Sequence, residues 1–276
     1  MTESRRAIPE ELKRAIRQRC GFGCVICGIP LVHIDHIEDY SVVLTHEESN
    51  LTLLCPSHHQ EKTNGLLSRE AVRAANDDPW NLRTGVTTPY LLHYGEESPT
   101  FVISGQEFRA PAGAEYFVPF MIDGAALILV EREAGQALIS LRMNDVFDFP
   151  QLIIARNEIL MSAAAYDVQL KGNTLTIREA PGKILVELVF DVSANKVRLE
   201  RGTFRLNGVQ WVIAKDQPIV LPTQTIGSIS IGAASVTFGT QIGLGLGICP
   251  PDASIGARIP QIDRYTRGPA KLPKQK

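Results

Sequence analysis

The sequence has 276 residues, of which 44% are hydrophobic, and a formal net charge of −2 at pH 7. That length suits one large domain or two ordinary ones, and the composition excludes general disorder. A nearly neutral chain has no overall attraction to nucleic acid, so any such affinity must come from a local patch. The chain has no apolar signal-like segment and no uncharged run near the ~20 residues of a membrane span, so we expect a soluble, cytoplasmic protein without membrane contact.

The first predicted element is a helix over residues 9–19. Pro9 suits its first position, Glu10 and Glu11 follow, and basic residues gather toward its end before Gly21. These basic side chains either form a solvated face or meet phosphates beside the segment that follows.

Residues 20–65 contain four of the five cysteines and five of the six histidines. Cys24 and Cys27 form a C-x2-C pair after a glycine-containing turn, and Cys55 and His58 form a C-x2-H pair. Sulfur and imidazole donors in two such pairs are what tetrahedral Zn²⁺ binds in structural sites. We therefore predict a structural zinc ion held by Cys24, Cys27, Cys55 and His58.

Short regular elements surround these two pairs of metal-binding residues. Apolar runs and turn residues predict strands over 31–37 and 51–54, a helix over 56–64, and another helix over 69–75 with Ser68 as its N-cap. The spare cysteines, Cys20 and Cys249, are expected to be small buried hydrophobic residues.

A second group of polar residues in the same window is not needed by zinc. His36 can act as a general base near neutral pH, because an unperturbed imidazole has a pKa near 6.5. Asp35 and His59 can share a catalytic Mg²⁺ or Mn²⁺ ion that stabilises charge on a phosphate. Asn50 can accept the ring N–H of His36 and so orient the imidazole.

Asp35 and His36 are neighbours on a predicted strand, where successive side chains point to opposite faces. Both can reach one site only if the strand ends or bends at residues 36–38. A regular pleat through residue 38 would make His33, which shares a face with Asp35, the rival candidate.

The segment 20–65 resembles the zinc-knuckle HNH endonucleases, which have a ββα-metal core. The matching residues are C-V-I-C-G at 24–28, I-D-H-I at 34–37, N-L at 50–51 and L-C-P-S-H-H-Q-E-K-T at 54–63. The resemblance covers about residues 9–75. It implies metal-dependent phosphodiester cleavage, with catalytic residues His36, Asn50 and His59.

One position departs from the family pattern. The family has C-x2-C followed at once by the histidine, whereas His58 stands where the second cysteine would be. Adjacent helical residues point about 100° apart, because a helix has about 3.6 residues per turn. We therefore assign His58 to zinc and His59 to the catalytic metal, with the reverse assignment as the alternative.

The chain beyond this module is predicted to be an all-β domain, so the fold class is α+β. Short apolar runs separated by turn signals indicate a sandwich or, alternatively, a short-rung β-solenoid. The predicted organisation is an HNH module over 1–76, a linker over 77–100, a β recognition or assembly domain over 101–249 and a mobile basic tail over 250–276.

The leading functional hypothesis is a metal-dependent DNA endonuclease with nucleic acid as its partner and a possible homo-oligomer formed through the β domain. The alternative is a catalytically silent, zinc-stabilised module that binds nucleic acid or protein. The presence of all four residues Asp35, His36, Asn50 and His59 favours the nuclease, because binding alone does not require them.

Overall fold

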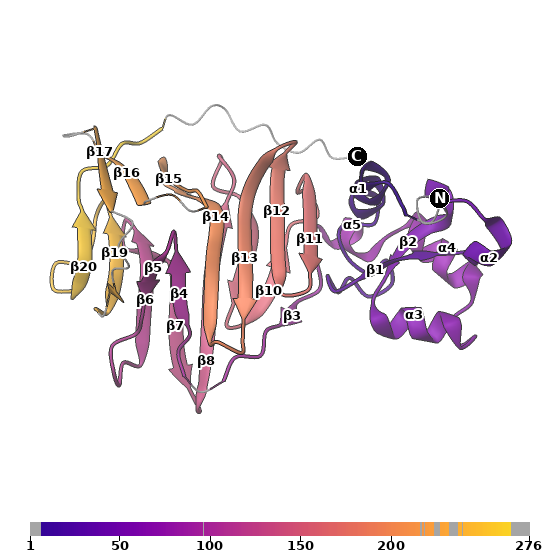
Figure 1. The fold of residues 1–276 in the computed structure, drawn as a ribbon, viewed down its shortest axis with the longest axis horizontal. Helices are drawn as coiled ribbons and strands as arrows, with labels where there is room; N and C mark the ends of the chain where they lie inside the picture. Colours follow the sequence, from indigo (N-terminus) through magenta and orange to yellow (C-terminus); the bar gives the residue numbers. More distant parts are fainter. Residues whose placement is uncertain are drawn as a thin grey trace. The chain divides into compact units, whose positions relative to one another are not determined.

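The computed structural model describes residues 7–95, 97–215, 217, 219–223, 227–231, 237–238 and 240–265. The chain forms two compact units. Unit 1 consists of the chain up to Tyr90 together with Leu160–Lys171 and Ile177–Pro181, and unit 2 contains the remainder. Helices gather near the N-terminus and extended sheets occupy the rest (Figure 1), which confirms the predicted α+β class.

Unit 1 contains the helices of the described chain. The predicted helices over 9–19, 56–64 and 69–75 are confirmed, and the Oγ of Ser68 accepts the N–H of Ala71 at 3.1 Å as the expected N-cap. The helical elements are α1 (Glu10–Arg19), α2 (Tyr40–Val43), the 3₁₀ helix η1 (Glu48–Asn50), α3 (Pro56–Thr63), α4 (Arg69–Asp77) and α5 (Trp80–Thr84).

A short hairpin of β1 (His33–His36) and β2 (Leu51–Leu54) precedes α3, which gives the order ββα. The two strands are antiparallel, with Asp35 opposite Thr52. β1 ends at His36 and residues 37–38 form a bend, so the predicted break in the strand is present. A small apolar core lies around this hairpin and includes Ile16, Cys20, Val25, Ile37, Leu51, Leu53, Leu54 and Val72.

The two large sheets are built mainly from unit 2. Their strand orders are β20-β19-β6-β7-β8-β9-β10-β3 and β11-β12-β13-β14-β4-β5-β18, and β15 pairs with β14 beside the second sheet. Strands β16 and β17 pair with each other in a separate two-stranded sheet. The bounds of these strands are β3 (Tyr90–Leu91), β4 (Thr100–Ile103), β5 (Gln106–Phe108), β6 (Tyr116–Ile122), β7 (Ala125–Glu133), β8 (Gln136–Asn144), β9 (Pro150–Ala155), β10 (Glu158–Met161), β11 (Asp167–Lys171), β12 (Thr174–Ala180), β13 (Lys183–Asp191), β14 (Lys196–Leu206), β15 (Val209–Ile213), β16 (Ile219–Thr223), β17 (Gly227–Ile231), β18 (Thr237–Phe238), β19 (Ile242–Leu246) and β20 (Ile255–Ile259).

A buried aromatic cluster joins the two sheets within unit 2. The ring of Phe120 on β6 lies 4.9 Å from that of Phe204 on β14 and 4.3 Å from that of Trp211 on β15, measured between centroids. All three side chains are fully buried. Sheets whose inner faces share a core in this way form a sandwich, which is the first of the two predicted forms.

Two segments predicted as linker and tail contain regular elements. The segment 77–100 includes α5, and the segment from residue 250 includes β20, which pairs in parallel with β19. Arg264 forms ion-paired hydrogen bonds to both carboxylate oxygens of Asp123, at 2.7 and 2.8 Å. The predicted tail beyond Tyr265 lies outside the described residues. None of the helices in the described part of the chain is long and apolar enough to cross a membrane.

Candidate metal centre and active site

A tight turn after α1 positions the first pair of cysteines. Gly28, with φ of +75°, closes the turn by donating its N–H to the carbonyl of Cys24 at 2.8 Å. A Cβ at Gly28 would lie only 2.4 Å from the side-chain oxygen of Asn81, so this position requires glycine. Asn81 on α5 also donates to the carbonyl of Gly21 at 2.8 Å. A helix in the predicted linker therefore supports the cysteine turn.

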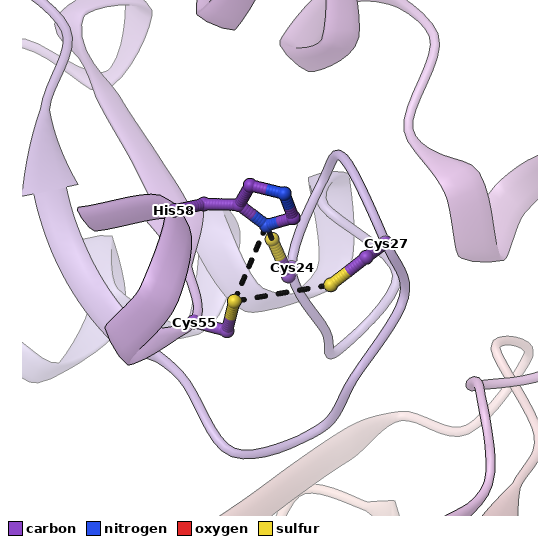
Figure 2. A group of neighbouring side chains, drawn as sticks. All are labelled: Cys24, Cys27, Cys55 and His58. Carbon is purple, nitrogen blue, oxygen red and sulfur yellow. Dashed lines mark hydrogen bonds between the residues drawn. The ribbon is translucent and has the colours of Figure 1, made fainter. Parts of the chain in front are cut away.

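The sulfur atoms of Cys24, Cys27 and Cys55 and one ring nitrogen of His58 converge between this turn and the start of α3 (Figure 2). The Nδ1 of His58 lies 3.3 Å from the Sγ of Cys24 and 3.2 Å from that of Cys55, and the sulfurs of Cys27 and Cys55 are 3.8 Å apart. Zn–S bonds of about 2.3 Å and a Zn–N bond of about 2.0 Å would give S–S edges of about 3.8 Å and S–N edges of about 3.5 Å in a tetrahedron. These four residues can hold a zinc ion.

One thiol of this cluster has a lowered pKa, which favours metal binding. A hydrogen bond from the Cys27 thiol lowers the pKa of Cys24 to about 4, although burial opposes the shift. The same hydrogen bond raises the pKa of Cys27, and burial adds to this shift. Because a metal ion binds thiolates, a divalent cation can replace the thiol protons of the cluster.

His59 follows His58 on α3 and contacts Asp35 rather than the cysteines. The Nδ1 of His59 lies 3.2 Å from the Oδ2 of Asp35 on β1. The His59 side chain is 47% exposed and that of Asp35 is 11% exposed. One carboxylate oxygen and one imidazole nitrogen therefore meet at an accessible position next to His36.

Lys62 completes this part of the site. Its ammonium lies 3.2 Å from the Oδ2 of Asp35 and also contacts the backbone carbonyl of His36, with the side chain 9% exposed. Lys62 was not assigned to this site from the sequence. Its spacing of three residues from His59 was the available signal, because residues three apart share one face of a helix.

The imidazole of His36 contacts two other rings. Its Nε2 lies 3.1 Å from the Nδ1 of His46, and the ring centroid of Tyr40 is 5.3 Å away. Burial lowers the pKa of His36, and the nearby His46 lowers it further. His46, which was assigned no role from the sequence, is a half-buried neighbour of His36.

Residues 18–65 match the family model for HNH endonuclease. No curated protein and no solved structure matches the chain. The HNH segment contains both groups of side chains described above, and it implies nuclease-type chemistry on nucleic acid with a metal-binding site. The family resemblance seen in the sequence is thereby confirmed for this segment of the chain.

Asn50 of the HNH segment has a different contact from the expected one. Its side-chain oxygen accepts the N–H of Glu38 at 2.7 Å, and its side-chain nitrogen donates to the carbonyl of Glu38 at 3.0 Å. The backbone N–H of Ile37 also donates to the carbonyl of Asn50. Because both ends of its carboxamide are used by the backbone after β1, Asn50 fixes the bend there, and the ring of His36 meets His46 instead.

The arginines of α1 form ion pairs and hydrogen bonds within unit 1, which neither of the two sequence-based alternatives included. Arg17 donates to both carboxylate oxygens of Asp167 on β11, at 2.8 and 3.0 Å. Arg14 lies 3.7 Å from the same carboxylate, and Arg19 contacts the carbonyls of Glu48 and Leu51. These cations hold α1 against other parts of unit 1.

Proposed function

We propose that the chain is a metal-dependent HNH endonuclease that hydrolyses phosphodiester bonds in DNA. The observation that carries the proposal is the 3.2 Å approach of the Asp35 carboxylate to the imidazole of His59, with His36 beside them at the end of β1. The family match over residues 18–65 supports the same chemistry.

In this proposal the zinc ion bound by Cys24, Cys27, Cys55 and His58 is structural. All four protein ligands are available, so no coordination position remains for substrate. The role of the zinc is to fix the start of α3 against the cysteine turn, which sets the direction of His59.

The proposed catalytic ion is Mg²⁺ or Mn²⁺, held by Asp35 and His59. Their oxygen and nitrogen donors fit such an ion, and their low ligand number leaves room for water and phosphate oxygens. When bound, the ion stabilises negative charge that develops on the phosphate and the leaving oxygen. Lys62 holds the Asp35 carboxylate and the carbonyl of His36 in fixed positions beside it.

His36 is the proposed general base, which takes a proton from the attacking water. The burial of this imidazole and its neighbour His46 lower its pKa, which keeps the ring in the neutral form that can accept a proton. Asn50 is a positioning residue in this scheme, because it fixes the bend that lets His36 and Asp35 serve one site.

Nicking of supercoiled plasmid in Mg²⁺ or Mn²⁺ tests the proposal. A single catalytic site of this kind cuts one strand at a time, so the expected product is a nicked circle. His36→Ala should bind zinc and fold as the wild type does, while the nicking rate falls by about 10²–10⁴-fold, the usual contribution of a general base.

His93→Ala is the matched control, because His93 is an exposed histidine of unit 2. Equal nicking by wild type and His36→Ala would refute the catalytic assignment. Salt-dependent DNA binding by a wild type that shows no metal-dependent cleavage would support the silent binding module instead.

A further inference from the structure

The imidazole of His36 contacts a side chain that belongs neither to the candidate zinc ligands nor to the Asp35–His59 pair. His46 lies ten residues further along the chain, yet its Nδ1 is 3.1 Å from the Nε2 of His36. Two imidazole nitrogens at this distance share one hydrogen, so one of them donates and the other accepts. The contact therefore couples the orientation and the tautomer of the two rings.

The local backbone brings His46 to this position. The chain leaves β1, forms the single turn of α2, and reverses at Leu44, which has φ of +55° and donates its N–H to the carbonyl of Tyr40 at 2.8 Å. The ring of Tyr40 is stacked on that of His46, with centroids 4.9 Å apart and planes 21° apart. Tyr40 also contacts His36, so the three rings form one cluster.

We infer that His46 is a positioning residue that fixes the orientation and tautomer of the His36 imidazole, so that Nδ1 of His36 is the atom that accepts the proton from water. The inference rests on the proposed nuclease function. With Nε2 of His36 facing His46, Nδ1 is the ring nitrogen left for water. For Nδ1 to carry a lone pair in the neutral ring, the hydrogen must be on Nε2, where the Nδ1 of His46 accepts it.

Asn50 does not supply this contact. Its carboxamide oxygen and nitrogen both bond the backbone of Glu38. The role that the sequence pattern suggested for Asn50 is therefore divided, with the bend fixed by Asn50 and the ring fixed by His46.

Three substitutions at His46 in the full-length protein separate hydrogen bonding from ring packing. His46→Phe keeps a ring to stack on Tyr40 and removes both nitrogens. In His46→Asn, the side-chain oxygen is bonded to Cγ, as Nδ1 is in histidine, so an acceptor stays at the same distance from the backbone. In His46→Gln, the amide lies one methylene further from the backbone. His93→Phe repeats the first substitution at an exposed histidine of unit 2.

The kinetic readout is plasmid nicking at saturating metal, with kcat and KM measured separately. We expect His46→Phe and His46→Gln to lower kcat by about 10–100-fold while KM changes by less than about twofold, and His46→Asn to return to within about threefold of wild type. Loss of a contact that orients the base lowers kcat without weakening substrate binding. His93→Phe should match wild type.

The spectroscopic readout is independent of turnover. Histidine ¹H–¹⁵N correlation spectra of the wild type should show His36 with its hydrogen on Nε2, and His46→Phe should lose this single tautomer. Zinc content and thermal unfolding identify any variant that fails to fold. Because Asn and Gln differ by one methylene, their comparison keeps the test valid if the Phe variant is unstable.

Several results would overturn the inference. These are unchanged kcat in all three variants, equal loss in the Asn and Gln variants, and an unaltered His36 tautomer in His46→Phe. Recovery of the Phe variant at higher Mn²⁺ concentration would make His46 a metal ligand and also overturn it. Failure of the wild type to nick DNA, or full activity of His36→Ala, would refute the proposed function itself and is thus a distinct outcome.

Discussion

Two adjacent histidines of α3 have separate surroundings in unit 1. His58 lies with three cysteines and His59 lies with Asp35, so one helical step of about 100° takes the chain from the candidate zinc site to the Asp35 carboxylate. A substitution at either residue should therefore affect one cluster directly. The C-x2-H spacing assigned His58 to zinc, but the reverse assignment stayed open in the sequence because both histidines have the same donor chemistry.

Lys62 contacts both the Asp35 carboxylate and the backbone carbonyl of His36. Its ammonium is nearly buried against a nearly buried carboxylate. Lys62→Met should lower the free energy of unfolding by about 3 kcal/mol, because it leaves the nearly buried Asp35 charge without its lysine partner. Urea unfolding at pH 7 measures this loss.

Lys13→Met is the matched control for Lys62→Met. Lys13 pairs with Glu10 on the exposed face of α1, where ion pairs contribute about 0–1 kcal/mol. If the two variants lost the same stability, the Lys62–Asp35 contact would have no special role in holding the site.

Individual side chains were predicted with uneven success, for physical reasons. Spacing alone indicated which four residues could bind zinc, because C-x2-C and C-x2-H turns bring their donors together locally. The contact of His46 with His36 could not be predicted, since it depends on the reversal at Leu44, a residue type that rarely adopts positive φ. The partner of Asn50 was missed because a carboxamide bonds backbone and imidazole equally well.

At the level of elements, α1 is attached to β11 by a buried carboxylate. Asp167 is fully buried, bonded by Arg17 and Gln169, and lies 3.5 Å from Arg178. Burial acts to raise the pKa of Asp167, but the hydrogen bonds from Arg17 and Gln169 and the charges of Arg17 and Arg178 outweigh it. The pKa of Asp167 is therefore below its ordinary value.

This shift predicts the acid dependence of stability. A carboxyl whose pKa is lower in the folded chain than in the unfolded one stabilises the fold above the unfolded value of about 3.9, and this contribution is lost as pH falls through the folded pKa. Asp167→Asn should cost about 3 kcal/mol at pH 7 and flatten the fall in stability below about pH 4.

Thermal unfolding from pH 3 to pH 7 measures this effect. Asp191→Asn is the control, since Asp191 also has a lowered pKa but belongs to unit 2. An Asp167→Asn profile parallel to the wild-type profile down to pH 3 would contradict the assigned role of Asp167.

The elements of unit 1 were more predictable than their partners. Helices α1, α3 and α4 follow from local signals such as Pro9, Pro56 and Ser68, which act within one turn. The pairing of Asp167 with Arg17 joins residues 150 positions apart in the sequence. No local pattern contains such a pairing, so the arginines of α1 were expected at phosphates or in solvent.

The whole molecule is not divided at a single point along its sequence. Unit 1 includes Leu160–Lys171 and Ile177–Pro181, which follow Leu91–Ile159 of unit 2 in the sequence. The predicted HNH module over 1–76 therefore lacks residues that pack with it, including Asp167. Local sequence signals do not report which distant strand a helix packs against.

A fragment of residues 1–90 tests this organisation. We expect it to bind zinc but to release the metal to a chelator faster than the full chain does, because Arg17 has lost its carboxylate partner. A second fragment, with residues 158–181 attached to 1–90 through a Gly/Ser linker, should recover part of the difference. Equal release rates from the short fragment and the full chain would show that the distant segments are not needed.

Unit 1 consists of three segments that are separate in the sequence, so it cannot be complete until the last of them has been synthesised. A ribosome that adds about 5–20 residues per second needs roughly 5–18 s to pass from Tyr90 to Pro181, since 181 − 90 is 91 residues. Until residue 167 is added, the nascent N-terminal segment has no Asp167 carboxylate to pair with Arg17. Chains released early, before Pro181 is made, therefore lack a complete unit 1.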